Sequence, residues 1–345
     1  MPGIRDVAKA AGVSTSTVSV VLNNSDKYVS EENRKKVLNA AEALGYKLPP
    51  KKVFTKETIA VLLPVITSSF FSNLLNGIEK IASLNDSILL YFNSNYNFEK
   101  EKACIMTLKK QNLSGIIIDT VCPVSEENQY FEWLKKEFED MGITVVVLER
   151  KVAYPGFYCI YVDNYKAAYN SIKHLISKGH ERIAHISGND KMLHTQERYM
   201  GYYNALKDNG LPVLNELIHK GNFTPYSGYV AMKEFLDMGI KFTALFSAND
   251  QMAIGAIKAI KAYGKRIPQD IAVVGFDNMS VSSMIEPALS TTNYSTYQMG
   301  MTAANIILSV HNGNKCSYQY ELETNLIIRR SSDENAGNEW ELEGW

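Results

Sequence analysis

The chain has 345 residues, of which 46% are hydrophobic and 21% are charged, and its formal net charge is −1. This composition excludes a low-complexity or disordered protein and provides enough apolar side chains for two or three domains. The strongest apolar run, residues 59–66, has only eight residues and contains Pro64. A membrane-spanning helix needs roughly 20, so we expect no membrane segment.

The four cysteines are scattered along the chain and form no C-x-x-C motif. The first residues are charged early and include no secretory apolar stretch. Together these features favour a reduced, cytoplasmic protein whose thiols are small core residues, with a redox or metal role as the alternative. We expect neither a cofactor nor a metal site. The cysteines are Cys104, Cys122, Cys159 and Cys316.

Positive charge is concentrated near the N-terminus. Residues 1–56 contain ten Lys or Arg and five acidic residues, whereas the last thirteen residues contain five acids and no base. A basic head on a nearly neutral body indicates that the head alone binds a polyanion. A solvated basic face would give the same charge pattern, so this signal needs support from motifs.

The first 48 residues predict three short helices. These cover residues 5–11, 14–22 and 30–45, with Ser14 and Ser30 as N-caps and a glycine after the first and third. The tight turn between the first two helices has helix-turn-helix spacing. We expect a shared aliphatic core formed by Val7, Ala8, Ala11, Val13, Val18, Val21, Leu22, Val37, Ala40, Ala41 and Leu44.

From residue 58 onward, apolar strands alternate with amphipathic helices. This order predicts a mostly parallel sheet covered by helices on both faces. About ten strands would exceed one comfortable core, so we expect two similar subdomains. The clearest strands cover residues 59–65, 87–92, 115–120, 144–149, 182–188, 217–223, 243–250 and 271–278.

Polar residues follow most of these strands. In open α/β sheets, ligands bind at the carboxyl ends of the strands, so these positions are candidates for a binding site. They are residues 67–69, 119, 149–150, 189–190, 223–224, 249–250 and 277–278.

Residues 11–24 read AGVSTSTVSVVLNN and form a two-faced helix when drawn at helical spacing. Val18, Val21 and Leu22 face the predicted core, and the hydroxyl side chains gather on the other face. Short polar side chains on an exposed first turn suit a recognition helix in the DNA major groove. The alternative is a Ser/Thr-rich surface helix without a special role.

Two consecutive stretches carry a resemblance to a known family: IRDVAKAAGVSTSTVSVVLNN and VSEENRKKVLNAAEALGY. They closely resemble the DNA-binding head of the lactose-repressor (LacI/GalR) family of bacterial transcription regulators. Further along the chain, TSSFF, ERYMGYYNAL, SANDQMAIGAIKAI and IPQDIAVVGFDN resemble signature segments of that family in the same order. The resemblance extends from about residue 4 to residue 331.

The resemblance implies an α/β fold: an N-terminal three-helix helix-turn-helix head and a periplasmic-binding-protein-like effector domain of two doubly wound parallel-sheet subdomains. It implies a dimeric repressor that binds palindromic operator DNA and responds to a small molecule, often a sugar. The expected domains are the head at 1–48, a shortened linker at 49–57, the effector and dimerisation domain at 58–332, and an acidic, disordered tail at 333–345. The expected subdomains are 58–160 with 293–325, and 161–292 with 326–332.

The resemblance also assigns DNA contacts by matching position. Thr15, Ser16 and Val20 stand where the family reads bases. Ser14, Thr17, Ser19 and Asn23 stand where it mainly contacts phosphates, and Ile4, Arg5, Tyr28 and Asn33 are at other DNA-facing positions.

Val20 departs from the family, in which many members have Arg at this position. An arginine there can bind guanine O6 and N7, whereas valine can only touch a thymine methyl or contribute little. We therefore predict an operator half-site without a guanine preference opposite residue 20.

The linker departs further from the family. It is about four residues shorter and lacks the A-R-x-L segment of the family's hinge helix, whose leucine enters the minor groove. Pro49 and Pro50 oppose a helix, so we expect the hinge helix to be absent or very short. Lys51, Lys52 and Lys56 can still contact phosphates.

Seven residues match the family's effector contacts, and their side chains suit a sugar site because they combine hydrogen-bonding groups with ring faces. Arg198 can instead be a surface charge, Asp277 a helix cap, and the two adjacent phenylalanines plain core. Glu149 stands where Asp is commoner, which leaves the ligand type open. The seven are Phe70, Phe71, Glu149, Arg198, Phe223, Asn249 and Asp277.

Enzyme signatures are missing: the sequence has no phosphate-binding loop, nucleophile elbow or H-E-x-x-H motif. We expect no catalytic residue, and His185 and His194 are interpreted as structural. A transporter's solute-binding protein shares the body fold, but residues 1–48 argue against that class. The sequence leaves open the effector's identity, induction or co-repression, the operator sequence and any assembly beyond a dimer.

Overall fold

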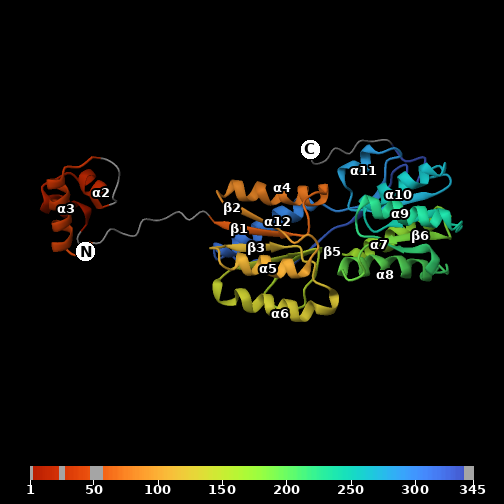
Figure 1. Ribbon diagram of the computed structural model, residues 1–345, viewed down its shortest axis with the longest axis horizontal. Coiled ribbons are helices and arrows are strands. Elements are labelled where there is room, and N and C mark those ends of the chain that lie inside the picture. The colour runs from red at the N-terminus through yellow and green to blue at the C-terminus, as the bar shows by residue number, and fades with distance from the viewer. Residues whose placement is uncertain (1–2, 23–27, 47–56, 338–345) are drawn as a thin grey trace. The chain divides into compact units, whose positions relative to one another are not determined.

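The computed structural model describes residues 3–22, 28–46 and 57–337. The chain divides into two compact units, Met1–Thr55 and Lys56–Trp345 (Figure 1). The expected linker lies outside the described residues except for its last position, and Asn23 lies outside them as well. The hinge expectation therefore stays a prediction.

The first unit has the three predicted helices. Gly12 adopts a φ of 65°, a left-handed conformation that glycine accepts without strain, and so turns the chain between the first two. Both predicted caps form: Ser14 Oγ accepts from the backbone N–H of Thr17 at 3.1 Å, and Ser30 Oγ from that of Asn33 at 3.4 Å. The helices are α1 (Ile4–Ala11), α2 (Thr15–Leu22) and α3 (Glu31–Ala43).

The head core contains ten of the eleven residues predicted for it, buried or partly buried. Leu44 is the exception: it is 38% exposed, because α3 ends at Ala43 and Leu44 lies in the turn beyond. Ile4, expected to face DNA, packs partly against this core. The fully buried members are Val7, Ala8, Ala11, Val18, Val21, Val37 and Ala41.

The second unit contains two six-stranded sheets, as the predicted pair of parallel-sheet subdomains requires. The strand orders are β11-β5-β4-β3-β1-β2 and β12-β10-β9-β8-β6-β7. All neighbours are parallel except β10 and β12. The strands are β1 (Thr58–Leu63), β2 (Ile88–Asn93), β3 (Gly115–Ile118), β4 (Thr144–Leu148), β5 (Tyr158–Val162), β6 (Ile183–Ser187), β7 (Ile218–Lys220), β8 (Ala244–Ser247), β9 (Ala272–Phe276), β10 (Ser290–Asn293), β11 (Gln319–Leu322) and β12 (Asn325–Ile327).

Helices cover both faces of each sheet. Figure 1 shows α4 and α12 on one face of the first sheet and α5 and α6 on the other, with α7 and α8 opposite α9 and α10 on the second sheet. Apolar cores fill the spaces between these layers. The helices are α4 (Ser69–Leu84), α5 (Phe98–Leu108), α6 (Glu127–Phe138), α7 (Asn164–Ser177), α8 (Leu193–Asp208), α9 (Pro225–Asp237), α10 (Asp250–Ala262), α11 (Ser280–Met284) and α12 (Thr296–His311); short 3₁₀ turns are η1 (Val124–Glu126), η2 (Glu139–Met141) and η3 (Asn215–Leu217).

Glycines let α4 and α12 touch backbone to backbone. A Cβ atom on Gly77 would lie 2.1 Å from the carbonyl oxygen of Tyr297, and one on Gly300 would lie 2.1 Å from that of Leu74. Neither position has room for a side chain. This crossing fixes α4, whose first turn carries Phe70 and Phe71.

The segment after residue 332 differs from expectation, because its first part contacts the second unit. Lys178 forms an ion pair with Asp333, and Gln269 Nε2 donates to Glu334 at 3.0 Å. The expected disorder therefore does not apply to residues 333–337, and the remainder lies outside the described residues. No described helix is long and apolar enough to cross a membrane.

Candidate functional site

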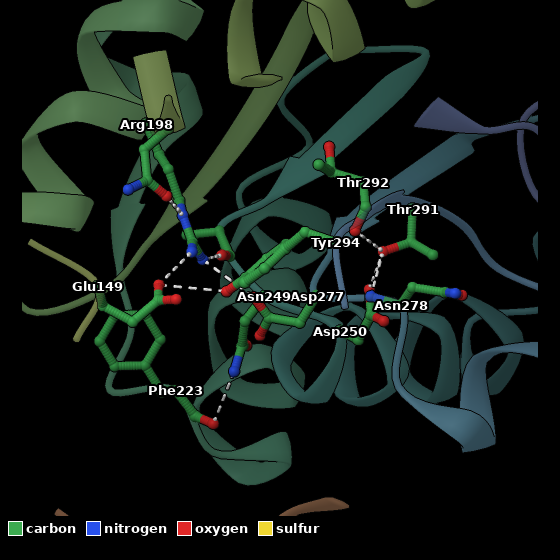
Figure 2. A network of polar contacts seen from close by, with 12 residues as sticks. Glu149, Arg198, Phe223, Asn249, Asp250, Asp277, Asn278, Thr291, Thr292 and Tyr294 are labelled. Atoms are coloured by element: carbon green, nitrogen blue, oxygen red, sulfur yellow. Dashed lines mark hydrogen bonds and ion pairs between the residues drawn. The ribbon is translucent and has the colours of Figure 1, made fainter. Parts of the chain in front are cut away.

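A cavity of about 150 Å³ lies where the carboxyl ends of strands from both sheets meet. All seven residues predicted to contact an effector line this cavity. Figure 2 shows five of them approaching one another from different elements. The first turn of α4, the ends of β4, β7, β8 and β9, and helix α8 supply the side chains. The predicted residues therefore share one site; their contact with a ligand stays a prediction.

Arg198 is a buried cation rather than a surface charge, being 3% exposed. Its Nε donates to Asn164 Oδ1 at 2.9 Å, and its Nη1 donates to the Ala248 carbonyl oxygen at 2.6 Å and to Asp277 Oδ1 at 3.4 Å. Its guanidinium carbon lies 3.6 Å from the ring centroid of Phe276, a favourable cation–π contact. The protein thus uses much of the donor fork that the sequence suggested for a ligand.

Glu149 is a buried carboxyl group with one oxygen unpartnered. Oε2 accepts from the Tyr294 hydroxyl at 3.2 Å and lies 4.0 Å from Arg198 Nη2 (Figure 2). Oε1 has no hydrogen-bond partner within the described part of the chain. Burial raises the pKa of Glu149 to about 7, against the opposing effects of Arg198 and Tyr294. Oε1 is therefore an acceptor that a ligand can satisfy.

Asp277 does not cap the helix that follows it. Helix α11 begins at Ser280, and the nearby backbone N–H of Met279 donates to Asp250 instead, at 2.8 Å. The Asp277 carboxylate faces Arg198 (Figure 2). Burial raises the pKa of Asp277 well above its usual value, and Arg198 opposes that shift. Its carboxylate remains available to the cavity.

Asn249 and Phe223 are joined by a hydrogen bond across the cavity wall. Asn249 Oδ1 caps α10 by accepting from the Met252 N–H at 3.0 Å, and its Nδ2 donates to the Phe223 carbonyl oxygen at 3.2 Å. The Phe223 ring lies on Gly188, where a Cβ atom would stand 2.0 Å from Cζ. Phe70 packs edge-on against Phe71 with ring centroids 4.8 Å apart, so these two rings serve both the core and the cavity wall.

Four lining residues hold left-handed backbone conformations although none is glycine. The φ angles are 55° at Tyr96, 56° at Glu149, 65° at Phe223 and 102° at Asp277. Such conformations cost about 1–3 kcal/mol each and cluster at functional sites, where the surrounding structure imposes them. The backbone of the cavity wall is therefore strained at these four residues.

Several lining residues were not predicted as effector contacts, among them Tyr96, His194 and Tyr294. Asp119 was predicted only as a candidate at a strand end, and it lines the cavity too. Tyr294 carried no signal, because it follows the polar strand β10, which has no apolar run. Burial lowers the pKa of His194 well below its usual value and that of His185 to about 4, so both are neutral.

The exposed face of α2 presents the predicted hydroxyl cluster. Ser14 Oγ lies 2.6 Å from Ser16 Oγ and 2.8 Å from Thr17 Oγ1. Ser14, Thr15 and Ser16 are exposed, whereas Thr17, Ser19 and Val20 are partly buried. Outside α2, Arg5 and Tyr28 are exposed and Asn33 is partly buried. These positions are compatible with DNA contacts, which stay a prediction.

Comparisons with known proteins cover both units. Residues 3–48 match the family of bacterial regulatory proteins, lacI family, and residues 56–328 match periplasmic binding proteins and sugar binding domain of LacI family. The chain is 32% identical over 335 residues to the transcriptional regulator RegA of Clostridium saccharobutylicum, covering 95% of this chain and 98% of that protein. It is 31% identical over 339 residues to the transcriptional regulator GalR of Escherichia coli (strain K12), covering 96% of each.

Solved structures are also similar to both units of the chain. The lac repressor dimer bound to operator and the anti-inducer ONPF is similar with a TM-score of 0.74 and 26% identity, covering 96% of this chain and 99% of that chain. The complex of the transcriptional regulator CelR with cellobiose is similar with a TM-score of 0.70 and 28% identity, covering 96% and 100%. The similarity therefore runs through head and body alike.

Proposed function

Because this chain belongs to the LacI family of bacterial transcription regulators, we propose that it is a dimeric repressor whose operator affinity is set by a small molecule bound between the two sheets. The observation that carries this proposal is the cavity at the strand ends, where seven matched residues from both sheets converge. Its role is regulatory rather than catalytic, and its place is the cytoplasm, with the DNA it binds. The transporter alternative is not favoured, since residues 3–48 match the regulators' head.

The lining favours a sugar or sugar derivative as effector. Carboxyl groups at Glu149 and Asp277 accept hydrogen bonds from hydroxyl groups, and the ring of Phe223 offers an apolar face. One solved relative holds cellobiose. A cavity of about 150 Å³ is smaller than those that hold drug-sized ligands, which start at about 300 Å³, so a single sugar ring fits best.

The effector acts by favouring one arrangement of the two subdomains. Phe70 and Glu149 belong to the first sheet's subdomain, whereas Arg198 and Asp277 belong to the second. A ligand that contacts both sets shifts the population between arrangements. In a dimer, that shift changes how two heads fit the half-sites of a palindromic operator. The effector can either release the repressor from its operator or tighten its binding to the operator, and both outcomes are compatible with this scheme.

In the head, we assign base contacts to Thr15, Ser16 and Val20 and phosphate contacts mainly to Ser14, Thr17, Ser19 and Asn23. Ser14 also caps α2, so its replacement would disturb the helix as well as the DNA contact. Thr15 and Ser16 cap nothing and are exposed, which makes them the cleaner pair to test.

Selection of operators from random DNA by the full-length chain tests this assignment. We expect a palindromic site without a dominant guanine opposite residue 20. The double variant Thr15→Ala/Ser16→Ala should bind the selected site at least about tenfold more weakly, since lost base contacts cost about 1–3 kcal/mol. Its thermal midpoint should stay unchanged. The control is Asn39→Ala, at an exposed position of α3. Full affinity in the double variant, or a dominant guanine, would contradict the assignment.

A further inference from the structure

Acidic side chains outnumber basic ones around the cavity. Asp119, Glu149 and Asp277 line it, whereas Arg198 is its only lysine or arginine among the described residues. Burial raises the pKa of Asp119 well above its usual value, and the neighbouring Glu149 adds to that shift. A buried charge is costly unless an opposite charge accompanies it. One guanidinium therefore accompanies three carboxyl groups, whose ionised forms burial disfavours.

Arg150 does not line the cavity, and its charge lowers the pKa of Asp119 only against larger opposing effects. Its Nη2 donates to the Cys122 carbonyl oxygen at 3.0 Å, and its Nη1 lies 3.7 Å from Glu127 Oε1. His194, which does line the cavity, stays neutral because burial lowers its pKa. Among the described residues, Arg198 is therefore the one charged cation in the cavity wall.

One buried acceptor in the cavity wall has no donor within the described part of the chain. The Nε and Nη1 groups of Arg198, the Asn249 amide and the Tyr294 hydroxyl each donate to a protein acceptor, whereas Arg198 Nη2 lies 4.0 Å from Glu149 Oε2. Glu149 Oε1, in contrast, is buried without a partner in the part of the chain that the structure describes. An unsatisfied buried acceptor costs about 1–3 kcal/mol, which a donor on a ligand would recover.

From this imbalance, and resting on the function proposed above, we propose that the effector presents a protonated amine to Glu149 and Asp119, as an amino sugar does. An ammonium group supplies three donors, no acceptor and one positive charge. Phe70 and Tyr96 also line the cavity, and aromatic faces attract cations. The sugar's hydroxyl groups then face Asp277 and the other polar residues of the wall.

Anionic and neutral sugars fit less well. A phosphoryl group brings a charge of about −1.5 to −2 beside three carboxyl groups, and Arg198, the one lysine or arginine that the described wall contains, already donates to Asn164, Ala248 and Asp277. A neutral sugar can donate to Glu149 Oε1 but brings no positive charge to favour the ionised form of the carboxyl groups. The expected order of affinity is amino sugar, then neutral sugar, then sugar phosphate.

Calorimetric titration of the full-length chain tests this order. The probes are matched sets in the gluco, galacto and manno configurations: the amino hexose, its N-acetyl derivative, the parent hexose and the parent 6-phosphate. The pH is held below the pKa of each amine. We expect one amino hexose to bind at least tenfold more tightly than its N-acetyl derivative and parent, with no binding of the 6-phosphate.

Glu149→Gln keeps the side chain's shape and removes its charge, so it should reduce the amine preference at least tenfold. The control Glu139→Gln changes an exposed acid of the same subdomain and should leave the preference intact. If Glu149→Gln does not fold, as judged by its thermal melt, Asp119→Asn replaces it with the same expectation.

Tighter binding of a neutral or phosphorylated sugar overturns the amine assignment, and the proposed function survives if that ligand changes operator affinity. Binding of no sugar in any set also overturns the amine assignment. The proposed function itself fails only if operator selection recovers no specific DNA. The two failures are therefore distinguishable.

Discussion

Glu149 concentrates several unfavourable features in one residue. Its backbone is left-handed, its carboxyl group is buried, and one of its oxygens lacks a partner within the described chain. Stability alone favours an apolar residue or a glycine at such a position. These costs are compatible with a residue retained for a ligand.

The buried carboxyl group predicts a pH-dependent stability. The pKa of Glu149 is raised from 4.5 to about 7 in the folded chain, in surroundings that include Arg198, Tyr294 and Glu197. The folded chain therefore holds a proton that the unfolded chain releases between these values. Its stability must fall as the pH rises from about 4.5 to about 7, and then level off. A shift of this size corresponds to about 3 kcal/mol.

Urea unfolding of the wild type and Glu149→Gln across this range measures the effect. Glutamine does not titrate, so the variant's stability relative to the wild type should increase by about 3 kcal/mol from pH 4.5 to above pH 7. The exposed Glu139→Gln variant should show no such trend. A pH-independent difference between wild type and Glu149→Gln would refute the assignment of this titration.

Residue identities at the site were predictable, but their partners were not. The seven cavity residues followed from the family resemblance, by matching position. The bonds from Arg198 to Asn164 and Ala248 join residues 34 and 50 positions apart, and no local pattern reports such pairs. The alternative role of Asp277 as a helix cap was wrong, because the fold places Asp250 rather than Asp277 against the Met279 N–H.

At the scale of elements, apolar periodicity predicted most of the structure. Apart from β5, α7 and α12, which were missed, the buried central strands and the amphipathic helices were found from periodicity. Strands β10, β11 and β12 were not, because polar residues fill them and neighbouring strands, rather than their own sequence, determine their conformation. The crossings between helices depend on glycines whose role appears only when two elements meet.

The contact between α4 and α12 predicts the effect of a small substitution. Alanine is the better helix former by about 1 kcal/mol, so Gly77→Ala would stabilise an isolated helix. Here the new Cβ atom would stand 2.1 Å from a backbone carbonyl oxygen of α12. Overpacking of this kind costs about 1–3 kcal/mol, and we expect a net loss of stability.

Urea midpoints of Gly77→Ala and Asn76→Ala test this expectation. Asn76 precedes Gly77 on α4 but is exposed, so its replacement should be neutral or slightly stabilising. A Gly77→Ala variant as stable as the wild type would show that the two helices can separate at little cost.

At the scale of the molecule, the chain passes repeatedly between the two sheets. It crosses after β5, between β10 and α12, and between β11 and β12. The alternation of strands and helices predicted two subdomains, and the return of late segments to the first sheet came from the family resemblance. Contacts such as Val124 N–H to the Lys191 carbonyl oxygen, at 3.0 Å, depend on the tertiary arrangement and have no local signal.

A regulator with two binding sites must obey reciprocity. The factor by which saturating effector changes the operator dissociation constant should equal the factor by which saturating operator changes the effector dissociation constant. Couplings of this kind are typically about 5–150-fold.

Fluorescence anisotropy of labelled operator with and without effector gives the first factor, and calorimetry of the effector with free and operator-bound protein gives the second. Thr15→Ala/Ser16→Ala should weaken operator binding with and without effector alike. It should leave the coupling factor unchanged, because the proposed role of these residues is to contact DNA, whereas the coupling depends on the equilibrium between the two subdomain arrangements. Unequal factors, or a factor of one, would mean that the cavity and the head are not coupled through a shared conformational equilibrium.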